Sequence, residues 1–153
     1  MKLRNSINTA LGWTLAFLMA VMVLNVLWQV FTRYVIGIPS SFTDELARYL
    51  LIWIGILGAA YAAGRRIHVA IDILPSRLSP RSQAKLLVFV NVVIIIFALT
   101  VLVIGGSRLV YITFLLKQNS PALQIPLGGV YTIIPVSGLL VVYYKISDLL
   151  NIK

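Results

Sequence analysis

The sequence contains few charged residues. Only 11% of its 153 residues are charged and 60% are hydrophobic, whereas a soluble domain of this size needs far more polar surface. Charge-free runs of 28, 16, 22 and 27 residues lie between Arg4 and Arg33, Arg48 and Arg65, Lys85 and Arg108, and Lys117 and Lys145. The hydrocarbon core of a bilayer is about 30 Å thick and takes roughly 20 helical residues to cross. The shortage of charge therefore excludes a soluble protein and predicts four membrane spans.

Cysteine is absent, and His68 is the single histidine. The lack of cysteine excludes disulfides, iron–sulfur clusters and thiol redox chemistry. One histidine cannot supply both axial ligands of a membrane haem, and His68 with Asp72 offers too few ligands for a metal. The sequence also lacks a serine–histidine–acid set and a glycine-rich loop after a strand. We therefore expect no catalytic residue, no metal, no cofactor and no enzyme.

The four acidic residues lie at the ends of the predicted spans rather than in their middle, at Asp44, Glu45, Asp72 and Asp148. A small proton-coupled exporter would need an acid near the middle of the membrane. The predicted helices thus carry no obvious coupling residue, which favours a scaffold for another protein.

The 13 cations give a net charge of +9, and their distribution favours membrane topology over nucleic-acid binding. Lys and Arg accumulate in cytoplasmic loops. Most of the cations lie before the first run, between the second and third, or after the fourth: Lys2, Arg4, Arg65, Arg66, Arg77, Arg81, Lys85, Lys145 and Lys153. Both termini and the middle loop are therefore predicted to be cytoplasmic, with the middle loop resting on anionic membrane lipid.

The runs are continuously apolar, which excludes the alternation of barrel strands and leaves helices. We predict an all-α membrane protein with short loops and one transmembrane domain over residues 1–153. Its four helices should span about residues 8–35, 43–65, 80–116 and 128–147. The first run is too long for a signal peptide and has no cleavage motif, so it should stay as an anchor. The third helix should tilt or protrude, and Pro135 should kink the fourth.

Three polar residues of the first predicted helix, Asn25, Gln29 and Arg33, share one face because they recur every four residues. Polar groups in hydrocarbon should face protein rather than lipid. Two interpretations remain open, namely contact with another helix of this chain and contact with a second subunit.

The second predicted helix starts with acids. Asp44 and Glu45 lie in its first turn, where the helix dipole favours them, and Arg48 lies within ion-pair spacing of both. Trp53 follows in the same helix and is expected to lie near the membrane surface, where tryptophan is enriched. Together with Arg33, the charged residues are predicted to order the outer end of the first two helices and to help present a surface to a partner.

Small residues gather on the same second helix, at Gly55, Gly58, Ala59 and Ala62. Small side chains let another helix approach closely. This face is predicted to pack against protein, either at the centre of the bundle or at a subunit interface.

Several motifs, in this order and spacing, resemble the small membrane subunit of tripartite ATP-independent periplasmic (TRAP) transporters. They lie at residues 28–34, 44–50, 58–60 and 120–123, and at Trp53, Arg66, His68, Asp72, Pro126, Tyr131 and Pro135. The resemblance implies an unfused, multi-pass subunit of the bacterial inner membrane. It would brace a large permease subunit, and a periplasmic substrate-binding protein would deliver an organic anion, such as sialic acid or a C4-dicarboxylate, for sodium-driven uptake.

Two other interpretations remain, a self-contained homodimeric transporter and an assembly factor or membrane enzyme of another type. Reconstitution of the chain alone would distinguish the first of these from a bracing subunit.

Overall fold

The computed structural model describes residues 2–38, 40–65 and 80–150, and most of this part of the chain is helical. In order, its elements are α1 (Lys2–Phe31), η1 (Thr32–Ile36), α2 (Ser41–Arg65), α4 (Pro80–Phe97), η3 (Ala98–Gly105), α5 (Gly106–Leu115), α6 (Leu127–Tyr131) and α7 (Ile133–Leu150). The elements η1 and η3 are π-helical continuations of α1 and α4.

Four helical stretches are long and apolar enough to cross a membrane: Leu3–Ile36, Ser41–Arg65, Lys85–Leu115 and Leu127–Leu150. No strand occurs in the ranges that the structure describes, apart from one isolated bridge between Asn119 and Pro126. The predicted all-α fold with four spans is therefore confirmed.

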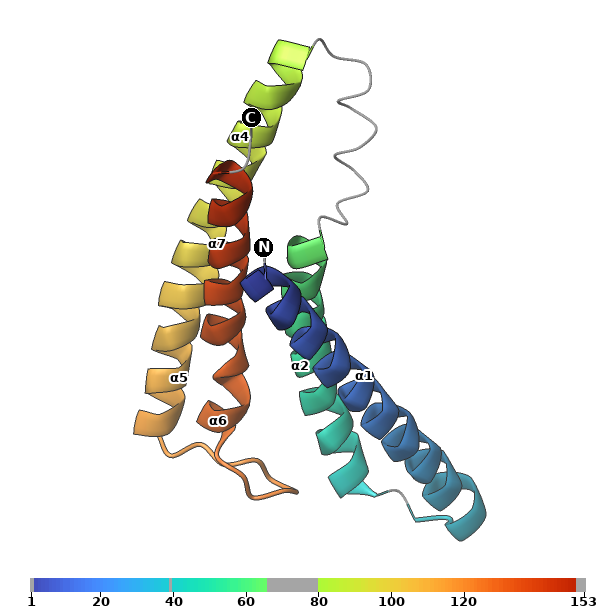
Figure 1. Ribbon diagram of the computed structural model, residues 1–153. Coiled ribbons are helices and arrows are strands. Elements are labelled where there is room, and N and C mark those ends of the chain that lie inside the picture. Colours follow the sequence, from blue (N-terminus) through green and yellow to red (C-terminus); the bar gives the residue numbers. More distant parts are fainter. Residues whose placement is uncertain (1, 39, 66–79, 151–153) are drawn as a thin grey trace.

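The helices form two hairpins that contact each other through α2 and α7 (Figure 1). α1 packs along α2, while α4, η3 and α5 pack along α7. α2 also contacts α7, and this contact connects the hairpins. The first hairpin leans away from the second toward the loop between α1 and α2, so that end of α1 is far from α5.

α7 is the most enclosed helix. Within the most apolar window of each span, 39% of the residues are buried for α7, compared with 22% for α2 and 11% for each of the other two. The ring of Tyr144 is completely buried between the hairpins. The small-residue helix α2 is thus less enclosed than α7, although it contacts both α1 and α7.

Glycine lets α7 approach the third span closely. A Cβ on Gly138 would lie 2.7 Å from Leu102 Cβ, and a Cβ on Gly106 would lie 2.9 Å from Ile134 Cγ2. These distances are shorter than carbon contacts allow, so each helix depends on the missing side chain of the other. The third and fourth spans therefore form a tight pair.

Helical hydrogen bonding pauses at Thr132, between α6 and α7, although the φ of −57° and ψ of −24° there remain right-handed helical. α6 ends at Tyr131 and α7 begins at Ile133, so Pro135 lies in the first turn of α7. Proline has no N–H to donate to the carbonyl four residues earlier, which is that of Tyr131. Thr132 bridges the interruption by donating its hydroxyl to Gly129 O at 2.6 Å. The kink expected at Pro135 stays a prediction, because the backbone angles remain helical through Thr132.

The third span runs without interruption from Pro80 to Leu115, but eight of its residues are π-helical. The first span likewise becomes π-helical over its last turn and ends at Gly37, whose φ of 77° is left-handed. Such a φ is easily adopted by glycine, which has no Cβ. No feature of the sequence had predicted either π-helical stretch.

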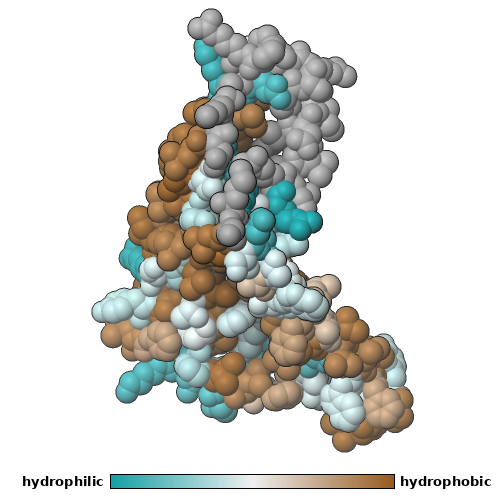
Figure 2. Space-filling model, viewed as in Figure 1, coloured by the Kyte–Doolittle hydropathy of each residue, from teal (hydrophilic) through white to brown (hydrophobic). Residues whose placement is uncertain are grey.

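Much of the apolar surface remains uncovered. Figure 2 shows broad hydrophobic areas over the helices, and large exposed side chains include Trp13, Phe17, Trp28, Phe89 and Leu116. A monomer in water rarely exposes this much contiguous apolar surface. The molecule therefore needs lipid, a partner protein or both around it.

Candidate functional site

The first polar contact of interest ties the start of α2 to the loop between α5 and α6. Glu45 is 9% exposed, and its Oε2 accepts hydrogen bonds from the backbone N–H groups of Ala122 at 2.8 Å and Leu123 at 2.9 Å. Its Oε1 accepts one from Tyr49 Oη at 2.7 Å. The buried Ser120 holds the same turn, because its Oγ accepts from Leu123 N at 3.1 Å. We call this set the Glu45 clasp.

The predicted ion pair of the outer cluster forms with Asp44 alone. Arg48 Nη2 lies 2.6 Å from Asp44 Oδ2, and both side chains are exposed. Glu45 turns away from Arg48 toward the loop. Its three donors include the backbone N–H of Ala122, which has no other acceptor among the described residues, and a backbone N–H is costly to leave unpaired. The local spacing therefore identified the Asp44 pair correctly and the Glu45 pair incorrectly.

The polar face of α1 meets the start of α2. The buried Asn25 donates from Nδ2 to Thr43 O at 2.8 Å, and Gln29 donates from Nε2 to Asp44 Oδ1 at 3.3 Å. Arg33 is exposed and lines a small hollow of about 240 Å³ with Gln29 and Asp44, and it has no carboxylate partner among the described residues. Asn25 and Gln29 thus link two helices of this chain, while the Arg33 side chain is left at the surface.

Two hydrogen bonds connect α2 with the fourth span inside the membrane region. Trp53 donates from Nε1 to Val130 O at 3.0 Å, where α6 is about to end. Ser137 donates from Oγ to Ile56 O at 2.8 Å. Trp53, which was predicted to be an aromatic residue at the membrane interface, therefore also donates a hydrogen bond to the carbonyl of Val130, two residues before Thr132.

A second clasp lies at the opposite end of the bundle, and sequence reasoning missed it. Arg4 Nη1 lies 2.6 Å from Asp148 Oδ1, while its Nε and Nη2 donate to Gly64 O at 3.2 and 2.7 Å. Its guanidinium carbon lies 5.5 Å from the centre of the Tyr144 ring. Lys145 and Asp148, both buried, add a longer contact of 3.9 Å. We call this set the Arg4 clasp.

The Arg4 clasp joins three helices, α1, α2 and α7, at one point. The last carbonyls of a helix have no intrahelical donor and favour a cation, and Arg4 supplies both a donor and a charge at the end of α2. A Cβ on Gly64 would lie 2.5 Å from Asn8 Oδ1 and 2.7 Å from Tyr144 Cζ. The one available signal was Asp148, an acid in an apolar segment that had to find a cation.

The predicted small-residue face of α2 is open within this chain. Nothing lies within 4 Å of a Cβ built on Gly55 or Gly58, and Ala59 is exposed while Ala62 is half-buried. The buried small residues of α2 are others, namely Ala60, Ala63 and Gly64. The stripe named from the sequence therefore points away from the chain's own core.

His68, Asp72 and Arg66 lie outside the residues that the structure describes. Among the described residues, no group of three or more metal-ligating side chains occurs.

The comparisons with known proteins decide the family. Residues 22–152 match the model of the DctQ component of tripartite ATP-independent periplasmic transporters. The chain belongs to this DctQ family of TRAP transporter small permeases.

Individual relatives of this DctQ-family chain agree. A protein named as a TRAP transporter small permease in Haemophilus influenzae is 32% identical over 151 residues, which covers 97% of this chain and 91% of that protein. The sialic acid TRAP transporter small permease SiaQ of Vibrio cholerae is 25% identical over 122 residues, which covers 76% of this chain and 70% of that protein. The isethionate TRAP transporter permease DctMQ of Oleidesulfovibrio alaskensis is 34% identical over 110 residues, covering 72% of this chain but 17% of that longer protein.

Proposed function

We infer that this DctQ-family chain braces a large permease subunit of the bacterial inner membrane and does not itself carry the substrate. A periplasmic binding protein would deliver an organic anion to the assembly, and a sodium gradient would drive its uptake. Two relatives are named for sialic acid and isethionate, which are both organic anions. The clasps at the two ends of the helices are the observation that carries this proposal.

The clasps support a rigid subunit. The Glu45 clasp connects α2 to the last loop, and the Arg4 clasp connects α1, α2 and α7. Buried charges that lose their partners are strongly destabilising, so relative movement of these helices would be unfavourable. An alternating-access carrier needs parts that rock against each other around a central site. Helices fixed at both ends are suited to bracing instead.

The positions of the acids also support bracing. In the described part of the chain, Asp44 and Glu45 lie at one end of the bundle and Asp148 lies at the other. A carrier that couples transport to cations commonly places ionisable groups or broken helices near the middle of the membrane. The polar contacts between Trp53, Ser137 and backbone carbonyls are already used for packing.

The open face of α2 is our proposed contact with the large subunit. Gly55, Gly58, Ala59 and Ala62 would let a helix of that subunit approach closely, as small residues do in membranes. The match to 17% of a much longer TRAP permease, named DctMQ, supports a large permease as the partner, because a segment similar to this chain belongs to the same polypeptide there.

The outer cluster is our proposed contact with the binding protein. Arg33, Asp44 and Arg48 are exposed or half-buried at the loop between α1 and α2, whereas Glu45 is occupied by its clasp. Reversing the charges of Asp44 and Arg48 together would allow an ion pair at the same spacing while reversing the local surface potential, and Gln29→Ala controls for the lost hydrogen bond to Asp44. Uptake that no longer saturates with binding protein in this double variant would support the contact.

Reconstitution in liposomes tests the bracing function. Sodium-driven uptake should require this chain, the large permease and the binding protein together. Uptake by this chain alone would favour the self-contained homodimeric transporter, and full uptake without it would exclude a necessary brace.

A further inference from the structure

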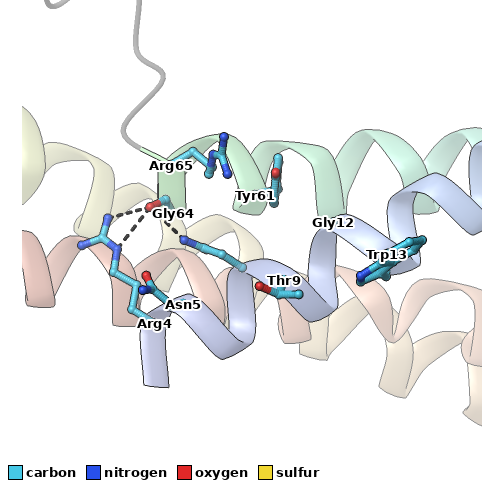
Figure 3. Close-up of a pocket in the computed structure, with 9 residues that line it drawn as sticks. Arg4, Asn5, Thr9, Gly12, Trp13, Tyr61, Gly64 and Arg65 are labelled. Carbon is cyan, nitrogen blue, oxygen red and sulfur yellow. Dashed lines mark hydrogen bonds between the residues drawn. The ribbon is translucent and has the colours of Figure 1, made fainter. Parts of the chain in front are cut away.

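A polar pocket of about 920 Å³ lies between the start of α1 and the end of α2, beside the Arg4 clasp. Figure 3 shows Asn5, Thr9 and Trp13 on α1 and Tyr61 and Arg65 on α2 around it. We propose that this pocket binds the phosphate headgroup of an anionic phospholipid, with Arg65 as the ligand of the phosphate. The inference is independent of the proposed bracing function.

Charge is the first argument. Two of the residues that line the pocket are arginines, and none is acidic. Arg4 is half-buried and already paired with Asp148, so it adds little free charge. Arg65 is exposed and has no acidic partner among the described residues. A guanidinium in this state favours a phosphate, which it can bind through two parallel hydrogen bonds.

Arg65 is also held in position. Its guanidinium carbon lies 5.7 Å from the centre of the Tyr61 ring, within the range of a cation–π contact. Tyr61 in turn lies on the backbone of α1, since a Cβ on Gly12 would be 3.6 Å from two atoms of its side chain. The arginine is therefore fixed at the mouth of the pocket by a ring that rests on the neighbouring helix.

The position of the pocket selects a lipid rather than a soluble anion. Arg65 is the last residue of the second span, and the first span begins at Leu3, so the pocket lies where both helices leave the apolar region. The exposed Trp13 lines its other side, and tryptophan is typical of the headgroup level. A phospholipid entering here would place its phosphate near Arg65 and its acyl chains along the exposed apolar surface of α1.

The same geometry favours an anionic phospholipid over a zwitterionic one. Phosphatidylcholine carries an ammonium group as well as the phosphate, and the lining residues offer no acid to pair with it. Phosphatidylglycerol carries the phosphate charge alone. Its headgroup also has hydroxyl groups, which can donate hydrogen bonds to Asn5 and Thr9 and accept hydrogen bonds from them.

Native mass spectrometry of the full chain in mild detergent tests the proposal. The chain is mixed with equal amounts of phosphatidylglycerol and phosphatidylcholine of identical acyl chains, and the bound fractions are compared. The unaltered chain should prefer phosphatidylglycerol, and Arg65→Gln should reduce the preference by about fivefold, the effect expected of one cation at a membrane surface. Lys85→Gln removes an exposed cation from α4 and is the matched control, which should leave the preference unchanged.

Further variants separate the charge of Arg65 from its contact with the Tyr61 ring. Tyr61→Phe keeps the ring and should keep the preference, whereas Tyr61→Leu should weaken it. Arg65→Lys keeps the charge and should retain part of the preference, so the proposal stays testable if Arg65→Gln folds poorly. Inorganic phosphate in excess should not displace the lipid.

Three results would overturn the proposal. The first is an equal affinity of the unaltered chain for the two lipids. Another is an equal loss of preference in the Arg65→Gln and Lys85→Gln variants, which would indicate general surface charge. The last is displacement by inorganic phosphate, which would indicate a site for a soluble anion.

Discussion

Gly138→Ala should loosen the contact between α7 and η3 and destabilise the chain. The new Cβ would lie 2.7 Å from Leu102 Cβ, 3.0 Å from Val103 Cγ2 and 3.2 Å from Val103 N. Carbon atoms pack at about 3.5–4.0 Å, so the first contact is short by about 1 Å. A Cβ and a backbone nitrogen cannot rotate away, so the helices have to separate. Overpacking of this kind typically costs about 1–3 kcal/mol.

Gly55→Ala is the matched control for this prediction. Gly55 also lies within a spanning helix, but nothing approaches within 4 Å of its built Cβ. Both substitutions add the same helix propensity, about 1 kcal/mol in favour of alanine, so the difference between them reports the clash. In an SDS titration of the detergent-solubilised chain followed by circular dichroism, Gly138→Ala should be about 1–3 kcal/mol less stable than Gly55→Ala. Equal stability of the two variants would refute the close approach of α7 and η3.

Three other predictions concern the ends and the open face of the bundle. Glu45→Ala should speed hydrogen exchange at the backbone amides of the last loop severalfold, whereas Asp44→Ala should leave it unchanged; equal rates would mean that the Glu45 clasp does not hold the loop. Gly58→Leu should leave the stability of the isolated chain at least as high but reduce co-purification with the large permease, and normal co-purification would show that this face contacts lipid. Because the chain has no native cysteine, Ser6→Cys and Gln118→Cys can be labelled singly; they should react with an impermeant reagent from opposite sides of the membrane, and Ser6→Cys only from the cytoplasmic side.

The four spans were predictable because the requirement for them is compositional. A charge in hydrocarbon is so unfavourable that its absence over 16 or more residues indicates where the chain crosses. Local signals also worked at helix ends. Ser40 accepts a hydrogen bond from Thr43 N through its Oγ, as expected of a residue before the first turn of α2. The Asp44–Arg48 pair is another local contact that spacing alone identified.

The clasps were not predictable from one sequence because their partners are far apart along the chain. Arg4 and Asp148 are separated by 144 positions, and Glu45 lies 77 positions from Ala122. Spacing rules rank only neighbours within a helix, so Arg48 was the one cationic partner that they could offer to Glu45. The actual partners of Glu45 include backbone amides, and these leave no trace in side-chain composition. The π-helical stretch Ala98–Gly105 likewise has no known sequence signature among its apolar residues.

The pause in helical hydrogen bonding at Thr132 and the π-helical stretch of the third span are the features that most resemble parts of a carrier, and their surroundings argue against that role. A transport site built on broken helices uses freed backbone groups and helix ends to bind the solute. At the pause before Ile133, the carbonyls of Val130 and Gly129 are instead paired with Trp53 and Thr132.

The π-helical stretch of the third span is almost entirely apolar, and the hydroxyl of Thr100, its one polar side chain, donates to Ile96 O at 2.8 Å. In both places the side-chain hydroxyls, those of Thr132 and Thr100, already donate to helix carbonyls and are not left free to bind an anion. A carrier also has to expose such a site alternately to the two sides, which in this chain would require the Glu45 and Arg4 clasps to open. The same contacts that would obstruct a carrier are compatible with the proposed bracing role, because they keep the helices fixed relative to one another.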